Sequence, residues 1–287
     1  MKSLDGNAIQ TRAEALRPGH TCTVDIPLDG TALAGAYNVH VGIKFDDGQE
    51  WLMRTPYCDG PMPPKEVLER IYKSEALSLT VLQGHGVPVP AVYECGTGPL
   101  SKNKGEYHYR LTLSVVPQLM SIGDSVVYTF FEKVSGRPSD NVASSLVKQR
   151  YIESYAQQAL TLSSLRFYSI GSLQLDENEK VVVGTVVNTR VGLAPIAPHW
   201  GGPFKSITEM YLHNIEGILK AIRDGTIYRD RPLFEYLAHL DVKTWLMEDK
   251  SMGLDQDEFY LWHPDSHSDN MMVGPDHQIS SMIDWQG

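Results

Sequence analysis

A cluster of His, Asp and Asn residues near the end of the chain carries the strongest chemical signal in the sequence. His263, Asp265 and Asn270 follow the apolar run 259–262, and Asp284 ends the next apolar segment. Carboxylate and carboxamide oxygens are the ligands that hard cations such as Mg²⁺ prefer. The pattern therefore predicts a metal-assisted site, provided that the surrounding elements bring these side chains together.

A short hairpin would do so. Residues 271–273 and 279–283 read as two strands, and residues 274–276 read as the turn between them. The outer ends of an antiparallel hairpin lie side by side, so we expect Asn270 close to Asp284. Asp265 would lie on the loop just before this hairpin.

A predicted helix over residues 63–83 supplies a second charged group. Its apolar face includes Ile71 and Leu79, and Glu75 lies midway between them at helical spacing. An unpaired charge in a core is very costly, so this position predicts a buried partner. Arg54, at the end of the preceding strand, is the expected one because Arg can bind a carboxylate bidentately. The alternative is a rim position where Glu75 reaches water.

These residues match the needs of phosphoryl transfer. That reaction uses a carboxylate that deprotonates a hydroxyl, an Asp and an Asn that hold Mg²⁺, and a cation on the nucleotide phosphates. Asp265 would be the base, Asn270 and Asp284 the Mg²⁺ ligands, and Arg54 the cation. His263 would then hold the loop through a backbone carbonyl or through Asp284.

Other chemistries use the same cluster differently. His263, Asp265 and a later His could form the facial triad of a non-haem iron oxygenase, but His267 is very near in sequence and His277 falls in the predicted turn. Alternating His263, Asp265, His267 and Asp269 could bind Zn²⁺ in a hydrolase. A polar loop without a ligand and a non-catalytic nucleotide-binding protein are further alternatives.

Composition narrows the class of protein. The 287 residues have a net charge of −10, 42% hydrophobic and 21% charged residues, as in soluble globular proteins. No Lys/Arg block is present, so we expect neither nucleic acid nor a membrane as partner. The three cysteines have no metal spacing, which indicates reduced thiols. Without a leader-like or spanning apolar segment, the expected location is the cytoplasm.

The order of patterns predicts an α+β fold. Strand-like segments dominate up to residue 131 and enclose the helix 63–83, whereas helical patterns dominate afterwards. We therefore expect residues 1–132 to form a five-stranded antiparallel sheet with one helix, and residues 133–287 to form a mainly helical part.

Several segments together resemble the aminoglycoside phosphotransferase and choline kinase family, the small-molecule branch of the protein-kinase-like fold. Fungal phosphotransferase-family proteins are the most similar group within it. The segments that carry the resemblance are Trp51 to Pro56, Lys73 to Ala76, Val87 to Pro90, Gly202 to Phe204, His263 to Asp265 with Asn270, and Ile283 to Trp285.

This resemblance implies a two-lobed, ATP-dependent enzyme that phosphorylates a hydroxyl of a small molecule and uses Mg²⁺. ATP would lie between the lobes, with backbone groups of Glu132 and Val134 on the adenine and Phe131 behind it. Gly35 belongs to the loop 29–36, which is rich in small residues and reads equally well as a phosphate-covering loop or as a flexible hairpin connection.

The chain departs from the family pattern at two places. Arg54 stands where the family usually has lysine; Lys44 mimics that lysine, but it is too early in the chain to precede the helix directly. Members of the family also continue beyond the position that corresponds to Gly287. We therefore expect residues 133–287 to lack the last helices of their lobe, and we expect phosphotransferase activity to depend on those helices. The sequence names neither the acceptor nor the oligomeric state.

Overall fold

The computed structural model shows an α+β protein, as predicted. Contacts divide the chain into two compact units, one of residues 1–159 with 263–287 and one of residues 160–262. The sequence predicts a boundary between residues 132 and 133, which separates the sheet from the helices. This boundary differs from the division into the two units, and it stays a prediction. The structure describes residues 4–26, 38–58, 64–100, 118–119, 125–139, 145–187, 200–248, 256–263 and 265–285.

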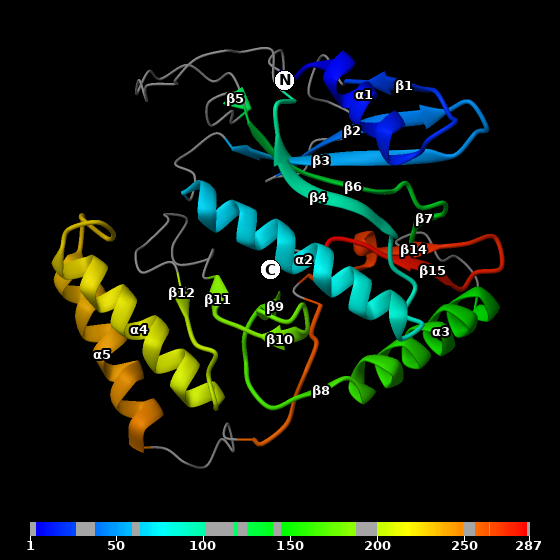
Figure 1. Cartoon of the computed structure of the whole chain (residues 1–287). Helices are drawn as coiled ribbons and strands as arrows, with labels where there is room; N and C mark the ends of the chain where they lie inside the picture. Colours follow the sequence, from blue (N-terminus) through cyan, green and yellow to red (C-terminus); the bar gives the residue numbers. More distant parts are fainter. Residues whose placement is uncertain are drawn as a thin grey trace. The chain divides into compact units, whose positions relative to one another are not determined.

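An antiparallel sheet forms the centre of the first unit (Figure 1). Five of its strands run in the order β1-β2-β3-β6-β4, and the short β5 pairs with β3 outside this path, so the described sheet has six strands where five were expected. Residues 107–115, whose sequence also predicts a strand, lie outside the described residues. The strands are β1 (Cys22–Asp25), β2 (Asn38–Phe45), β3 (Glu50–Cys58), β4 (Val92–Gly98), β5 (Gln118–Leu119) and β6 (Val126–Glu132).

Helix α1 (Gly6–Leu16) packs against one face of this sheet. The helix begins after Asp5, whose side chain accepts from two backbone N–H groups of the first turn, a common N-terminal cap. Alternate residues of each strand point to this face, as the period of a strand requires. Together with Ile9 of α1, these strand residues form a core that includes Val41, Met53 and Phe130.

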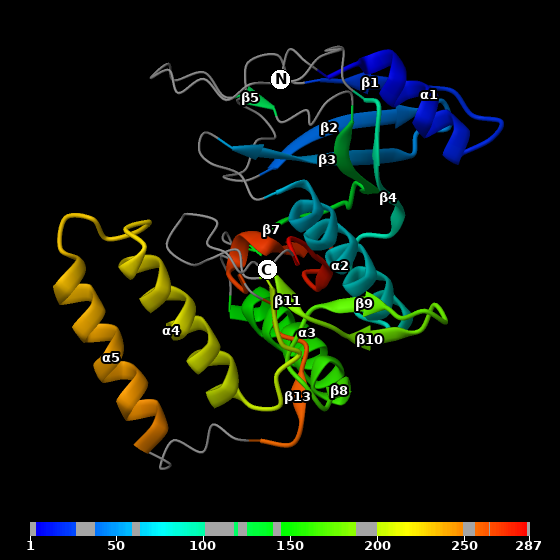
Figure 2. The same cartoon turned by 60° about the vertical axis from the view of Figure 1, so that its left-hand side comes forward.

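Helix α2 (Lys65–Gly84) lies beside β4 and β6 in both views, and its contacts with them are direct (Figures 1 and 2). The predicted helix over residues 63–83 is therefore confirmed. Its buried face contains apolar residues and one carboxylate: Val67, Leu68, Ile71, Tyr72, Glu75, Ala76, Leu79 and Leu82.

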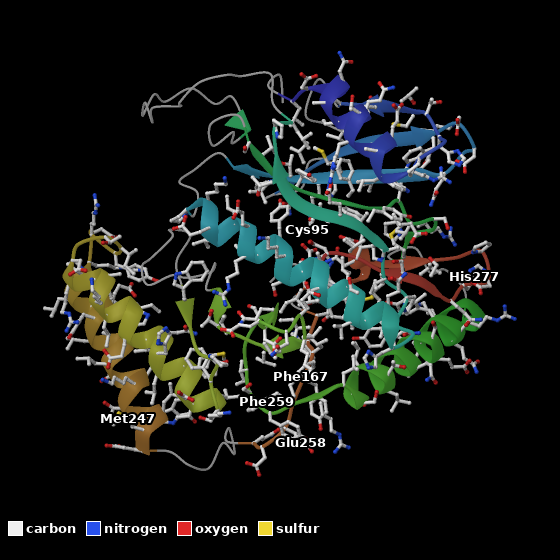
Figure 3. All side chains as sticks on the ribbon, in the orientation of Figure 1. Cys95, Phe167, Met247, Glu258, Phe259 and His277 are labelled. Carbon is white, nitrogen blue, oxygen red and sulfur yellow. The ribbon has the colours of Figure 1, made fainter. Side chains whose placement is uncertain are left out.

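The predicted C-terminal hairpin is also present. Strands β14 (Met271–Val273) and β15 (Ile279–Met282) are antiparallel and follow the 3-10 turn η2 (Ser268–Asn270). Strand β7 (Arg137–Pro138) adds a third strand next to β14. His277 lies at the turn of this hairpin (Figure 3), at the opposite end from Asn270.

Helix α3 (Ser145–Ser164) runs from the first unit into the second. The second unit contains α4 (Ile207–Arg223) and α5 (Pro232–Glu248), which pack together through Ile215, Leu219 and Leu246. Among the described residues, no helix combines the length and apolar character needed to cross a bilayer. The remaining short strands are β8 (Arg166–Phe167), β9 (Leu173–Leu175), β10 (Val181–Val183), β11 (Val186–Val187), β12 (Trp200–Gly201) and β13 (Phe259–Tyr260).

Candidate active site

Strand register places Arg54 on the face of the sheet that α2 covers. Arg54 pairs with Thr129 on β6, and Thr129 pairs with Cys95 on β4, so the three side chains share one face. Figure 3 marks Cys95 on this strand. Burial raises the pKa of the Cys95 thiol, which keeps it protonated and unreactive at neutral pH.

Arg54 forms a buried ion pair with Glu75 of α2, through its Nη2 atom and the carboxylate Oε2. Their side chains are only 6% and 5% exposed, so both charges have left water and each needs the other. The rings of Tyr72 and Phe131 lie 5.4 and 5.7 Å from the guanidinium carbon and add cation–π contacts. Glu75 thus has a buried partner rather than a rim position.

The same guanidinium reaches the second charged element of the site. Nη1 of Arg54 lies 3.7 Å from Oδ1 of Asp284, whose side chain is 48% exposed. The Nε atom of Arg54 is buried and has no hydrogen-bond partner among the described residues. Arg54 therefore contacts two carboxylates, while its buried Nε has no partner in the part of the chain that the structure describes.

Asp284 has an unusual backbone conformation, with φ of 64°. This left-handed region is costly for a residue with a side chain, although Asp tolerates it better than most. The neighbouring residues account for it. The N–H of Ile283 donates to the carbonyl of Asn270 over 2.9 Å, and the indole N–H of the buried Trp285 donates to the carbonyl of Met282 over 3.1 Å. The residues before and after Asp284 are thus both held by hydrogen bonds, just beyond the end of β15.

His263 joins the loop to this segment. Its Nε2 donates to the carbonyl of Ile283 over 2.8 Å, and its Nδ1 accepts from the N–H of Asp265 over 3.2 Å. The ring is 3% exposed and lies 4.6 Å from the ring of Trp285. Of the two partners expected for His263, the backbone carbonyl is therefore the one that it binds.

These two bonds fix the tautomer of His263 as neutral with the proton on Nε2. Burial lowers the pKa of His263, although its bond to Ile283 and the charges of Asp284 and Asp265 oppose this effect. Both ring nitrogens are occupied, so His263 has no lone pair left for a metal. The iron and zinc alternatives both require such a ligand and do not fit this arrangement.

Asn270 links the loop to the hairpin. Its Nδ2 donates to the backbone carbonyl of Asp265 over 2.8 Å and to the carboxylate Oδ2 of Asp265 over 3.3 Å. Asn270 is 8% exposed, whereas the Asp265 side chain is 48% exposed. The buried amide therefore orients a carboxylate that solvent can reach.

The residues expected around an adenine lie at the end of β6. The N–H of Glu132 donates to the carbonyl of Ala91 over 2.8 Å. Phe131 is half-buried and meets His40 edge to face, with ring centroids 6.0 Å apart. Val134 is half-buried in the segment after the strand. Gly35 lies outside the described residues.

Three features of the site were not predicted from the sequence. Tyr72 was missed, although it precedes Glu75 by one helical turn and so shares its face. The Ile283 carbonyl is a backbone group, which no residue pattern singles out. His267, considered only as a metal ligand, instead places its Nε2 3.1 Å from Oδ2 of Asp265.

No family model and no curated protein sequence matches the chain. Solved structures similar to it include a macrolide 2′-phosphotransferase from Brachybacterium faecium, with 16% identity, a TM-score of 0.46, and 98% of this chain and 72% of that one covered. A macrolide 2′-phosphotransferase type I has 15% identity, a TM-score of 0.44, and 99% and 73% coverage. An aminoglycoside-3′-phosphotransferase of type VIII has 15% identity, a TM-score of 0.43, and 97% and 76% coverage. The function proposed below rests on the residues of the site.

Proposed function

We propose that this protein is an ATP-dependent phosphotransferase that acts on a hydroxyl group of a small molecule. One observation carries the proposal: Arg54 contacts both Glu75 and Asp284 in the first unit, while Asn270 orients Asp265 on the adjoining loop. Phosphoryl transfer depends on positioned charge more than on covalent chemistry, and these are the charges that it uses.

Asp265 would be the general base for the acceptor hydroxyl. Its carboxylate is half-exposed, and one of its oxygens, Oδ2, accepts from Nδ2 of Asn270. The other oxygen is the one available to a substrate proton. His263 supports this role by holding the Asp265 N–H, and with it the start of the loop, in place.

Arg54 would bind the phosphates of ATP. Its unpartnered Nε fits an anionic group, because a buried donor without an acceptor is costly and a phosphate oxygen would satisfy it. Glu75 would hold the guanidinium in position. The Arg54 site therefore fits a nucleotide, although arginine replaces the lysine that the family resemblance leads us to expect.

Asn270 and Asp284 would hold Mg²⁺. The amide nitrogen of Asn270 is bound to Asp265, so its Oδ1 is the atom available to a cation, and the half-exposed Asp284 supplies a carboxylate. This all-oxygen donor set fits Mg²⁺. When bound, Mg²⁺ would neutralise charge on the transferred phosphoryl group.

The adenine would meet backbone groups of Glu132 and Val134, with Phe131 behind it and Gly35 in the loop over the phosphates. The net charge of −10 favours a cationic acceptor such as an aminoglycoside or an amino alcohol. The cytoplasm is the proposed location, in keeping with the thiol chemistry expected of the three cysteines.

A non-catalytic nucleotide-binding protein is a second candidate. The observation that favours it is the arginine at position 54, where the family usually has lysine, whose side chain is buried in an ion pair with Glu75. A guanidinium so firmly held would bind phosphate yet adjust little during transfer. This candidate predicts ATP binding without turnover of any hydroxyl acceptor.

Calorimetry with ATP in the presence and absence of Mg²⁺ tests the proposal. We expect Mg²⁺-dependent heat from the unaltered protein, loss of that dependence in Asp284→Ala, and no change in Asp257→Ala, an exposed carboxylate of the second unit. ADP release with a panel of aminoglycosides and amino alcohols then separates an enzyme from a binding protein. No heat from the unaltered protein refutes the proposal, and equal heat from Asp284→Ala removes Asp284 from the metal role.

A further inference from the structure

The carboxylate of Asp265 has a second close neighbour, to which the phosphotransferase roles assign nothing. Nε2 of His267 lies 3.1 Å from Oδ2 of Asp265, the same oxygen that Nδ2 of Asn270 approaches at 3.3 Å. Nδ1 of His267 lies 3.8 Å from Oδ2 of Asp269, which is too long for a hydrogen bond. Of these two carboxylates, Asp265 is therefore the one closer to the His267 ring, at ion-pair distance.

We infer that His267 is a positioning residue for the general base, an inference that rests on the proposed function. Asp265 lies on a loop and is half-exposed, so its carboxylate would otherwise rotate freely about its terminal torsion. The hydrogen bond from Asn270 and the ion-pair contact with His267 both reach Oδ2 and restrict that rotation. Oδ1 is then the oxygen presented to the acceptor hydroxyl.

Backbone contacts give His267 a fixed place from which to act. Its N–H donates to the carbonyl of Asp265 over 2.9 Å, and its own carbonyl accepts from the N–H of Asn270 over 3.1 Å. The neighbouring carbonyl of Ser268 accepts from the hydroxyl of Ser139 over 3.0 Å, which ties the loop to the end of β7. The ring therefore approaches Asp265 from a turn that is itself anchored.

A merely structural contact predicts a different outcome. The two side chains are 54% and 48% exposed, and exposed pairs of this kind contribute little to stability. Loss of the ring should therefore leave the unfolding midpoint almost unchanged. Misorientation of a reacting group costs rate instead, up to about 100-fold for a displacement near 1 Å.

Three variants separate these outcomes: His267→Ala, His267→Gln and the neighbouring Asp269→Asn. With the best acceptor from the panel, we expect kcat to fall about 10- to 100-fold in His267→Ala while KM for ATP stays within about twofold. His267→Gln keeps a donor at a similar reach and should recover most of kcat. Asp269→Asn should behave like the unaltered protein. An unchanged kcat in His267→Ala, or an equal loss in His267→Gln, overturns the inference.

A spectroscopic measurement tests the contact without activity. Long-range ¹H–¹⁵N spectra of the imidazoles, assigned with His267→Gln, should show a proton on Nε2 of His267 and a shift of that resonance in Asp265→Asn. An unchanged Nε2 resonance overturns the contact. Absence of ATP heat from the unaltered protein refutes the proposed function and the positioning role with it, whereas the spectra still decide whether the hydrogen bond exists.

Discussion

Removal of one member of the Arg54–Glu75 pair should destabilise the first unit strongly. Glu75→Ala leaves a guanidinium that is 6% exposed, and its remaining carboxylate neighbour, Asp284, is 3.7 Å away. Breaking a buried pair costs about 3–5 kcal/mol, because the remaining charge is desolvated and unpaired. Asp284 and the rings of Tyr72 and Phe131 offset part of that cost, so we expect a loss of about 3 kcal/mol in the free energy of unfolding.

A double variant separates stability from function. Arg54→Met combined with Glu75→Leu removes both charges and retains most of the volume. Apolar replacement of a buried ion pair is often neutral or stabilising, so we expect stability within about 1 kcal/mol of the unaltered protein. ATP binding should nevertheless be lost, since the proposed phosphate donor is gone.

Urea unfolding, followed by circular dichroism and tryptophan fluorescence, measures these differences. Lys65→Ala is the matched control, because it breaks the Lys65–Glu69 pair in the same helix, where the atoms are 3.6 Å apart and both side chains are partly exposed. That change should cost about 0.5 kcal/mol or less. A strongly stabilising role for the charge pairing is refuted if Glu75→Ala lowers the free energy of unfolding no more than Lys65→Ala does. It is also refuted if the double variant is as unstable as Glu75→Ala.

Three further predictions concern the hairpin and its loop. Burial lowers the pKa of His263, so the unfolded chain takes up a proton at a higher pH than the folded protein does. The free energy of unfolding should therefore have its full value above about pH 6.5 and fall as the pH drops below it. In His263→Gln, the urea midpoint should fall less steeply over the same pH range. Met271→Ala, at a side chain that is 1% exposed, should lower the free energy of unfolding by about 2–5 kcal/mol in the same assay. Asp284→Gly should change stability by less than about 1 kcal/mol, because relief of the left-handed conformation offsets the added chain entropy, yet calorimetry should show no Mg²⁺-dependent ATP binding.

Local signals in the sequence predicted the local elements well. The Asp47-Gly48 turn joins β2 to β3, and alternate residues of β2 from Val39 to Phe45 are buried. Helical periodicity placed the Glu75 carboxylate among apolar residues, which predicted a buried ion pair because an unpaired buried charge is strongly destabilising. The terminal hairpin followed from its Gly-Pro-Asp turn.

Long-range pairing was harder to predict. Strand β4 pairs with β6 rather than with β3, and β7 joins the hairpin through Arg137 and Pro138, a stretch that reads as a boundary loop. A two-residue strand has no periodicity, and proline normally indicates the absence of a central strand. The chemical type of His263 and His267 was visible in the sequence, but the atoms that each ring nitrogen contacts depend on the folded loop.

The backbone strain at Asp284 coincides with the chemistry proposed for it. The Ile283 N–H and carbonyl are both bound, to Asn270 and to His263, so the chain leaves β15 in a fixed direction. A residue at φ of 64° then turns its carboxylate toward Arg54 instead of continuing the strand. Such a conformation costs of order 1 kcal/mol or more and persists only where surrounding contacts impose it. Stability alone does not favour aspartate over glycine here; the carboxylate is explained if its place beside Arg54 serves a bound phosphate and its cation.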